Sequence, residues 1–155
     1  MADSIQIWVE VSHHAAFRCG GWAFVRKDAE GLSGAAGGDR SVTLERAVLA
    51  GLAQALQGLP AGGTGAVLTS SPYIAALPGR IAGFTSGEEP PSENLDLWAQ
   101  LTTALKSVRI GRAENQPGTP TAFAAAWAEL ARDKAKATGP FRSPIPKPNL
   151  AKAGA

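Results

Sequence analysis

The hydrophobic pattern of this chain changes period near residue 43, and this change constrains the fold more than any other feature. Before it, "SIQIWVEVS" (residues 4–12) alternates apolar and polar positions, as a β-strand does. "WAFVRK" (22–27) and, more weakly, the glycine-rich "EGLSGAAGG" (30–38) continue as strands, and their short connections favour an antiparallel meander. From Thr43 to Leu56 apolar residues recur every three or four positions, which predicts an amphipathic helix. Trp8, on the polar side of the first strand, indicates that both faces of the sheet are covered.

The rest of the chain alternates strands with helices. Residues 66–69 form a predicted strand that leads directly into a helix at Pro72, because proline suits the first helical position. We expect Pro78 to interrupt that helix. A helix over 94–107, a strand over 108–114 and a closing helix over 121–137 follow. The order predicts an α/β fold with a five-stranded mixed sheet, three antiparallel strands plus two parallel ones, and helices on both faces.

Length and composition favour one domain. The chain has 155 residues, and we expect a folded domain over residues 1–138 followed by a basic, proline-rich tail over 139–155 that is extended or disordered. Cys19 is the single cysteine, so no intramolecular disulfide forms. The N-terminal residues do not read as a leader, and no apolar run is long enough for a membrane span, so we expect a cytoplasmic protein without membrane contact.

Several local sequences, in this order, resemble ribonuclease H. They are "IWVEVS" followed by "GGWAFV", then "TLERAVLAGLAQAL", "VLTSSPYI", and "NLDLWAQLTTAL" before "AWAELARDKA". The resemblance covers roughly residues 4 to 137 and implies the ribonuclease H-like fold.

The resemblance also implies a catalytic site, and here the chain departs from the family. Family enzymes cleave the RNA strand of an RNA–DNA hybrid with two Mg²⁺ ions held by four carboxylates. The corresponding positions are Glu10, Glu45, Ser70 and Ala128, so two of the four acids are missing. Glu129 is expected to point away, because it lies about 100° around the helix from Ala128. We therefore expect a degenerate site without functional catalytic residues, and no cofactor.

Two of these positions keep open interpretations. Glu45 suits the first turn of a helix on electrostatic grounds alone. Glu10 either belongs to a vestigial, hydrated site or makes a new polar contact with a residue such as Ser70. At most, Glu10 and Glu45 would form a weak Mg²⁺ or Mn²⁺ site. Zinc is disfavoured, because the adjacent His13 and His14 do not converge on one ion.

Cationic and polar side chains outside the catalytic positions are the candidates for nucleic-acid binding. Arg40 and Ser41 precede a predicted helix, whose N-terminus suits an anion. The basic tail suits a polyanion through counterion release, although solvated linkers share this composition. The full candidate set is His13, His14, Arg18, Arg40, Ser41, Lys134, Lys136, Arg142 and Lys147.

The sequence leaves three functional hypotheses. The first is a non-catalytic ribonuclease H-like domain, a pseudoenzyme that binds RNA, DNA or their hybrid. The second is a protein-interaction scaffold or homodimer, with "SPIPKP" in the tail as a polyproline II ligand for a protein partner. The third is a weak residual Mg²⁺- or Mn²⁺-dependent hybrid endonuclease.

Overall fold

The computed structural model describes residues 4–28, 31–57, 59, 64–87, 91–107, 109–114 and 119–155. Strands and helices follow one another much as the hydrophobic pattern predicts, and two further elements come after the expected closing helix. In chain order they are β1 (Ser4–His14), β2 (Cys19–Asp28), β3 (Gly31–Asp39), α1 (Leu44–Leu56), β4 (Thr64–Leu68), α2 (Pro72–Thr85), α3 (Leu95–Ser107), β5 (Arg109–Glu114), α4 (Thr119–Thr138), β6 (Phe141–Pro144) and α5 (Lys147–Leu150).

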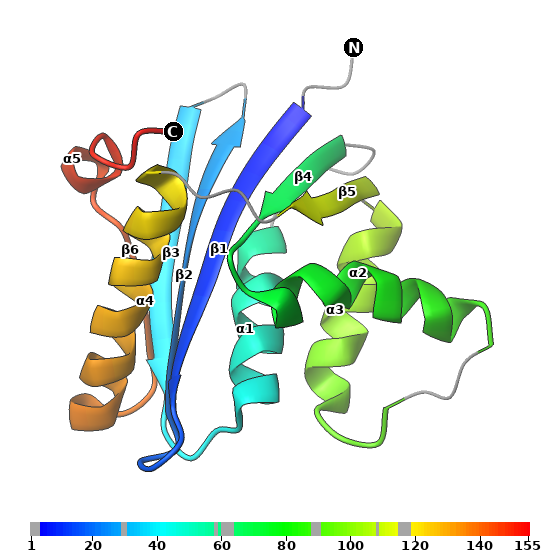
Figure 1. Cartoon of the computed structure of the whole chain (residues 1–155), viewed down its shortest axis with the longest axis horizontal. Helices are drawn as coiled ribbons and strands as arrows, with labels where there is room; N and C mark the ends of the chain where they lie inside the picture. Colours follow the sequence, from blue (N-terminus) through cyan, green and yellow to red (C-terminus); the bar gives the residue numbers. More distant parts are fainter. Residues whose placement is uncertain are drawn as a thin grey trace.

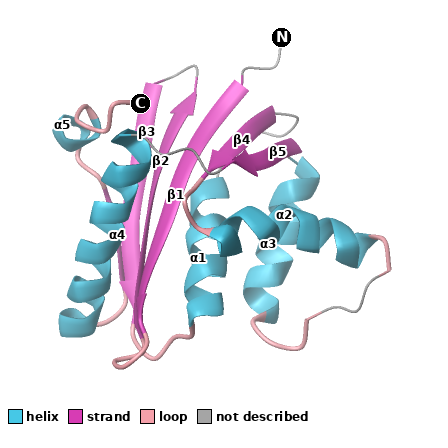
Figure 2. Cartoon of the chain, viewed as in Figure 1, coloured by secondary structure: helices cyan, strands magenta, loops and turns pink. Residues whose placement is uncertain are grey.

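The strands form one mixed sheet in the order β5-β4-β1-β2-β3-β6. β1, β2 and β3 make the expected antiparallel meander, and β4 and β5 extend it as parallel strands on the other side of β1. Helix α4 covers one face, whereas α1, α2 and α3 lie on the other (Figures 1 and 2). The predicted α/β class, with three antiparallel and two parallel strands between helices, is confirmed.

The alternation in β1 divides its side chains between two apolar cores. Ile7 and Val9 are buried in the core that α1, α2 and α3 share with the sheet. Trp8 points the other way, into a smaller core beneath α4. The prediction that both faces are covered is therefore confirmed, and β1 lies at the centre of the molecule.

Helix α4 lies close to the sheet because both surfaces carry small residues. The helix buries a stripe of alanines, namely Ala124, Ala128, Ala131 and Ala135. Opposite them, a Cβ atom at Gly21 would overlap the backbone of Ala128 and Arg132. This close approach sets the rotation of α4 about its axis, and so decides which of its side chains face β1.

An ion pair connects α1 with the start of α3. Arg46 donates to both carboxylate oxygens of Asp96, at 3.1 and 3.0 Å. These hydrogen bonds lower the pKa of Asp96 and raise the pKa of Arg46. The pair therefore stabilises the fold above the ordinary pKa of aspartate, and this contribution is lost as the pH falls through the lowered value.

The chain after Gly139 corrects the expectation of an extended or disordered tail. Residues 141–144 add β6 to the sheet as the antiparallel neighbour of β3, so the sheet has six strands among the described residues rather than five. Ile145 and Leu150 are buried in the core beneath α4. The proline-rich composition misled the prediction, because an edge strand tolerates prolines and a few apolar side chains fill the remaining space.

Helix α2 also differs from expectation, because it continues through Pro78 to Thr85. Proline forfeits one backbone hydrogen bond. Leu77 and Ile81, on either side of it, are both buried in the main core. Their packing holds the two halves in one helix. None of the helices in the described part of the chain is long and apolar enough to cross a membrane.

Candidate functional site

The register of the two central parallel strands brings Glu10 and Ser70 together. Trp8 on β1 is aligned with Leu68, the last residue of β4. Two residues further along each chain stand Glu10 and Ser70, at the carboxyl end of β4. This is the edge where open α/β sheets place functional groups. The two side chains are in contact, as one of the two open interpretations of Glu10 required.

The carboxyl group of Glu10 is buried and surrounded by donors from its own chain. Only 3% of the surface of Glu10 is exposed to solvent. Thr69 Oγ1 donates to Oε2 at 2.7 Å, and the Ser70 amide lies 3.2 Å from each carboxyl oxygen. The Ser70 hydroxyl donates to Oε1. Of the two interpretations of Glu10, the structure therefore favours the new polar contact.

A small pocket opens next to Glu10, and α4 contributes an acid to it. The pocket has a volume of about 280 Å³ and is lined by β1, by the start of α2, and by Ala125 and Glu129 of α4. Glu129 was expected to point away, and that expectation is wrong. Ala128, the position matched to the fourth carboxylate, is fully buried against the sheet instead. The close approach of α4 turns Ala128 inward and Glu129 toward the pocket.

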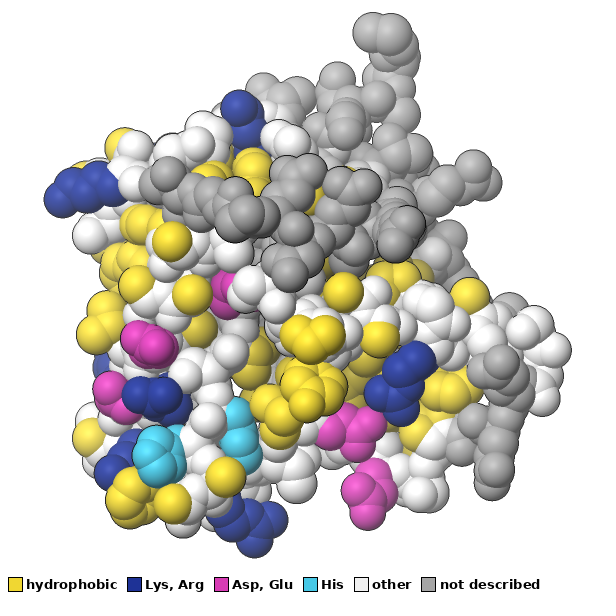
Figure 3. Space-filling view, in the orientation of Figure 1, with side chains coloured by type: hydrophobic (Ala, Val, Ile, Leu, Met, Phe, Trp, Pro, Cys, Tyr) yellow, Lys and Arg dark blue, Asp and Glu magenta, His cyan; other side chains and the backbone are white. Residues whose placement is uncertain are grey.

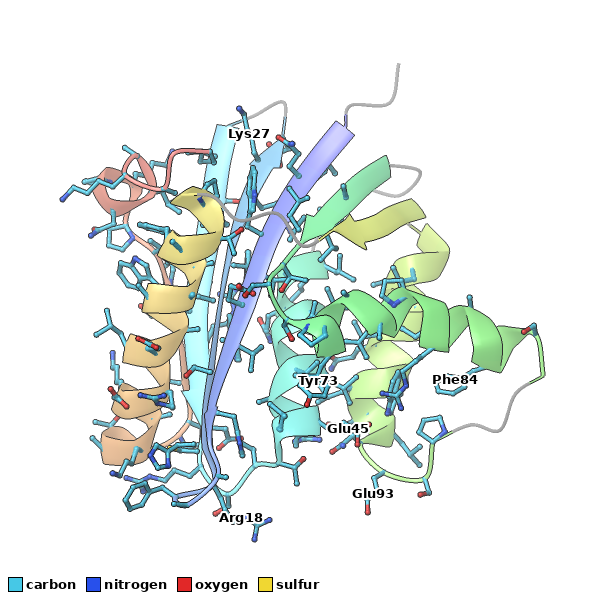
Figure 4. The ribbon with its side chains drawn as sticks, in the orientation of Figure 1. Arg18, Lys27, Glu45, Tyr73, Phe84 and Glu93 are labelled. Atoms are coloured by element: carbon cyan, nitrogen blue, oxygen red, sulfur yellow. The ribbon has the colours of Figure 1, made fainter. Side chains whose placement is uncertain are left out.

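Glu45 stands at the rim of a second pocket between α1 and α2. Its carboxylate lies 3.5 Å from Arg80 Nη2, and both side chains are about half-exposed. This pocket has a volume of about 550 Å³ and shares Leu44, Val48, Pro72 and Tyr73 with the smaller one. Figure 4 shows Tyr73 and Glu45 extending toward this region from α2 and α1. Glu45 lines only the larger pocket and Glu10 only the smaller.

Several of the predicted nucleic-acid ligands gather at one end of the molecule. The β1–β2 turn, the loop before α1 and the last turns of α4 meet there, and we call this surface the basic end: His13, His14, Phe17, Arg18, Arg40, Ser41 and Lys136. His13 Nε2 is hydrogen-bonded to Val42 O at 2.8 Å, which ties the turn to the loop. Figure 3 shows the histidines together with Lys and Arg side chains at this end.

An exposed aromatic ring lies at the centre of the basic end. Phe17 is 56% exposed, and the His14 ring packs against it with centroids 4.8 Å apart. The Lys136 ammonium lies 3.4 Å from the Phe17 centroid. Arg18 is at the tip of the same turn (Figure 4). The surface thus combines cations with a flat apolar ring, the combination that stacks bases and pairs with phosphates.

Arg40 has a structural task that the sequence did not indicate. Its guanidinium donates to the carbonyl oxygens of Ala135, Lys136 and Ala137, at 2.9 to 3.1 Å. It therefore caps the C-terminus of α4 rather than projecting toward an anion at the start of α1. Ser41 beside it is exposed.

The remaining predicted ligands lie apart from the basic end's centre. Lys134 places its ammonium over the Phe141 ring at 4.6 Å. Arg142 donates to Gln54 Oε1 at 2.7 Å, which connects β6 to α1. Lys147 begins α5, near the C-terminus and away from the β1–β2 turn (Figure 1).

Sequence reasoning missed four residues around the two pockets. Thr69 holds Glu10, Arg132 donates to Ser12 Oγ at 2.9 Å, and Tyr73 and Arg80 line the larger pocket. A signal for α4 was present, because residues 125, 129 and 132 recur at helical spacing next to the alanine stripe. No comparable pattern marked Tyr73 or Arg80.

Comparisons with solved structures identify the fold. The N-terminal RNase H domain of rv2228c from Mycobacterium tuberculosis, solved as a fusion with maltose binding protein, is 18% identical, with a TM-score of 0.63 over 88% of this chain and 99% of that one. LC9-RNase H1, a type 1 RNase H with the type 2 active-site motif, is 14% identical, with a TM-score of 0.67 over 100% of this chain and 82% of that one. LC11-RNase H1, solved in complex with RNA/DNA hybrid, is 18% identical, with a TM-score of 0.63 over 84% of this chain and 98% of that one.

The chain has a ribonuclease H-like fold, as the sequence resemblance implied. No protein-family model matches it, and no curated protein matches its sequence. At identities below one fifth, these likenesses show the architecture, and function has to be argued from the site itself.

Proposed function

We propose that this chain is a non-catalytic nucleic-acid-binding domain built on the ribonuclease H-like fold. The observation that carries the proposal is the burial and hydrogen bonding of the Glu10 carboxyl group. Glu10 is buried and accepts hydrogen bonds from Thr69 and Ser70, while cations and an exposed aromatic ring lie together on the surface at the basic end.

The residues present do not fit the two Mg²⁺ ions that the fold family implies. Two hard dications need several anionic oxygens around one point. Here the oxygens of Glu10 already have protein donors, Glu45 pairs with Arg80, and position 70 supplies only a hydroxyl. Among the described residues, no three His, Cys, Asp or Glu side chains are grouped closely enough to hold a metal. These residues therefore do not support a two-metal hydrolytic step.

Binding on this proposal is electrostatic with an aromatic contribution. His14 and Lys136 lie against Phe17, and Arg18 follows it in the same turn, so phosphates and an unstacked base can be contacted together. The ligand class is RNA, DNA or their hybrid, and no divalent ion takes part. LC11-RNase H1 was solved with such a hybrid, which supports this choice of probes.

Fluorescence anisotropy with labelled hybrid, duplex and single strands tests the proposal across a salt series. We expect affinity to fall as salt rises, and equally with or without Mn²⁺. The double variant Arg18→Gln/Lys136→Gln should bind about fivefold to tenfold more weakly, with a log–log salt slope smaller by about 1.5.

The matched control is Lys27→Gln/Lys152→Gln, which removes the same charge from other positions. Lys27 lies at the opposite end of the sheet from Arg18 (Figure 4). Equal losses in the two double variants would show that the basic end is not the binding surface. A wild-type protein that binds none of the probes would refute the proposal.

A second candidate function is weak Mn²⁺-dependent hydrolysis of the hybrid. One observation favours it, because Glu129 lines the same pocket as Glu10. Cleavage that EDTA abolishes and that is lost in both Glu10→Gln and Glu129→Gln would establish this alternative.

A further inference from the structure

The larger pocket, between α1 and α2, has no role in the function proposed above. Its volume of about 550 Å³ is in the range of small-ligand sites. Val48, Pro72, Ala76 and Leu77 form its apolar wall. It adjoins the Glu10 pocket through shared lining residues, so a strand passing the centre of the sheet would also pass this opening.

Tyr73 gives the pocket an available flat surface. The residue is 60% exposed although it lines both pockets. It stands in the first turn of α2, where the helix and Pro72 fix its backbone. Single-stranded nucleic acids place unpaired bases on such rings, because every base has a π-face.

The rim of the pocket carries an acidic and a basic side chain next to each other. Glu45 and Arg80 make one 3.5 Å contact, and their side chains are 43% and 47% exposed. Arg80 also lies over the Trp98 ring, at 4.7 Å from its centroid, which limits its movement. A single contact leaves a second carboxylate oxygen and further guanidinium N–H groups for a ligand.

We propose that this pocket binds an unpaired guanine base. The inference rests on the proposed function, because the base belongs to a nucleic acid held at the basic end. Tyr73 stacks on the base, Glu45 accepts from its N1–H and its 2-amino group, and Arg80 donates to its O6 or N7. Guanine alone among the common bases presents two adjacent donors beside an acceptor, which complements a neighbouring carboxylate and guanidinium.

The test compares short labelled oligouridine strands by fluorescence anisotropy at one salt concentration. One strand contains a single central guanosine, and others contain adenosine or inosine at that position. The guanosine strand should bind about tenfold more tightly than the plain or adenosine strand. Inosine lacks the 2-amino group, so it should give an intermediate affinity.

Variants of the pocket separate this site from the basic end. Tyr73→Ala and Arg80→Gln should abolish the guanosine preference but keep the affinity for plain oligouridine, and Tyr73→Phe should retain the preference. Arg46→Gln is the matched control, because Arg46 is a similarly exposed, ion-paired arginine on the neighbouring part of α1. Circular dichroism confirms that each variant is folded.

The two proposals fail in different ways. If all strands bind wild type equally, or if pocket variants keep the guanosine preference, the guanine site is refuted while nucleic-acid binding stands. If neither hybrid nor any single strand binds, both proposals fail. If the pocket binds a side chain of a partner protein and not a base, all strands would again bind equally, and the guanine site would be refuted.

Discussion

Glu10 shows how donors from the protein itself can hold one carboxyl group at the centre of this fold. A buried carboxyl group requires hydrogen-bond donors. Thr69 and Ser70, at the end of the neighbouring parallel strand, provide them here. The polar contact thus has a structural role.

The Thr69 hydroxyl contributes measurably to stability on this account. Thr69→Val keeps the shape of the side chain but removes both a donor to a buried carboxyl group and an acceptor for the Ser71 amide, so it should lower the free energy of unfolding by about 2 kcal/mol. Urea denaturation measures this difference. Thr102→Val is the control, because the Thr102 hydroxyl only donates to a carbonyl of its own helix, at 2.8 Å, and should cost less than about 1 kcal/mol. Equal effects would contradict the assignment.

Restoring an acid at position 70 should make stability depend on metal. Ser70→Asp replaces a donor to Glu10 with a second carboxylate, so we expect a loss of about 1–2 kcal/mol without metal. Mn²⁺ should raise the melting temperature of this variant but not that of wild type. Ser92→Asp, in an exposed loop, is the control. An unchanged response to Mn²⁺ would mean that residue 70 does not face an ion-binding position.

The position for a further acid differs from the one that the sequence indicated. Ala128 is fully buried in the apolar core, so an aspartate there would unfold the site rather than complete it. Ala125 lines the pocket, so Ala125→Asp is the substitution to combine with Ser70→Asp. A larger gain in Mn²⁺ affinity for the double variant than for either single change is the expected result.

At the scale of single elements, the helices were predictable but their rotation was not. The spacing of apolar residues located α4 in the sequence. Which of its side chains face the sheet depends on how closely its alanines approach Gly21 and the strands around it. A shift of one residue along the helix turns a side chain by about 100°. That is why Glu129, and not Ala128, reaches the pocket.

Arg40 holds the C-terminal end of α4. Arg40→Ala removes three hydrogen bonds to the last carbonyls of α4 and should lower the free energy of unfolding by about 1–2 kcal/mol. Nucleic-acid affinity should fall no further than in Lys27→Gln, because Arg40 serves the helix rather than the ligand. Arg142→Ala, which loses one surface contact to Gln54, is the control for stability. A large loss of affinity without a loss of stability would restore Arg40 as a phosphate ligand.

For the whole molecule, local patterns predicted the succession of strands and helices along the chain and the placing of helices on both faces of a mixed sheet. Alternation in β1, the helical period after Thr43 and the strand before Pro72 all describe segments that are regular by themselves. The tail could not be predicted in this way, because its few apolar residues matter only where α4 and β3 leave a gap. The Thr69 contact and the Tyr73 pocket likewise depend on tertiary placement.

Removing the tail should therefore cost stability and solubility. A chain ending at Thr138 lacks β6 and the buried Ile145 and Leu150, so we expect a loss of about 3–5 kcal/mol in urea denaturation. It also exposes the edge of β3, which should cause concentration-dependent association in sedimentation. The full-length variant Lys147→Ala/Lys152→Ala should change neither property. Unchanged stability of the shortened chain would contradict the packing described above.

The most direct measurement follows binding and cleavage in the same sample. Labelled RNA–DNA hybrid is mixed with excess unmodified protein and Mn²⁺, its anisotropy is read, and the RNA strand is then resolved on a denaturing gel. We expect bound hybrid and intact RNA. RNA cleavage that is abolished by EDTA and also by the Glu10→Gln substitution would show that Glu10 still holds a catalytic metal. That result would contradict the non-catalytic assignment.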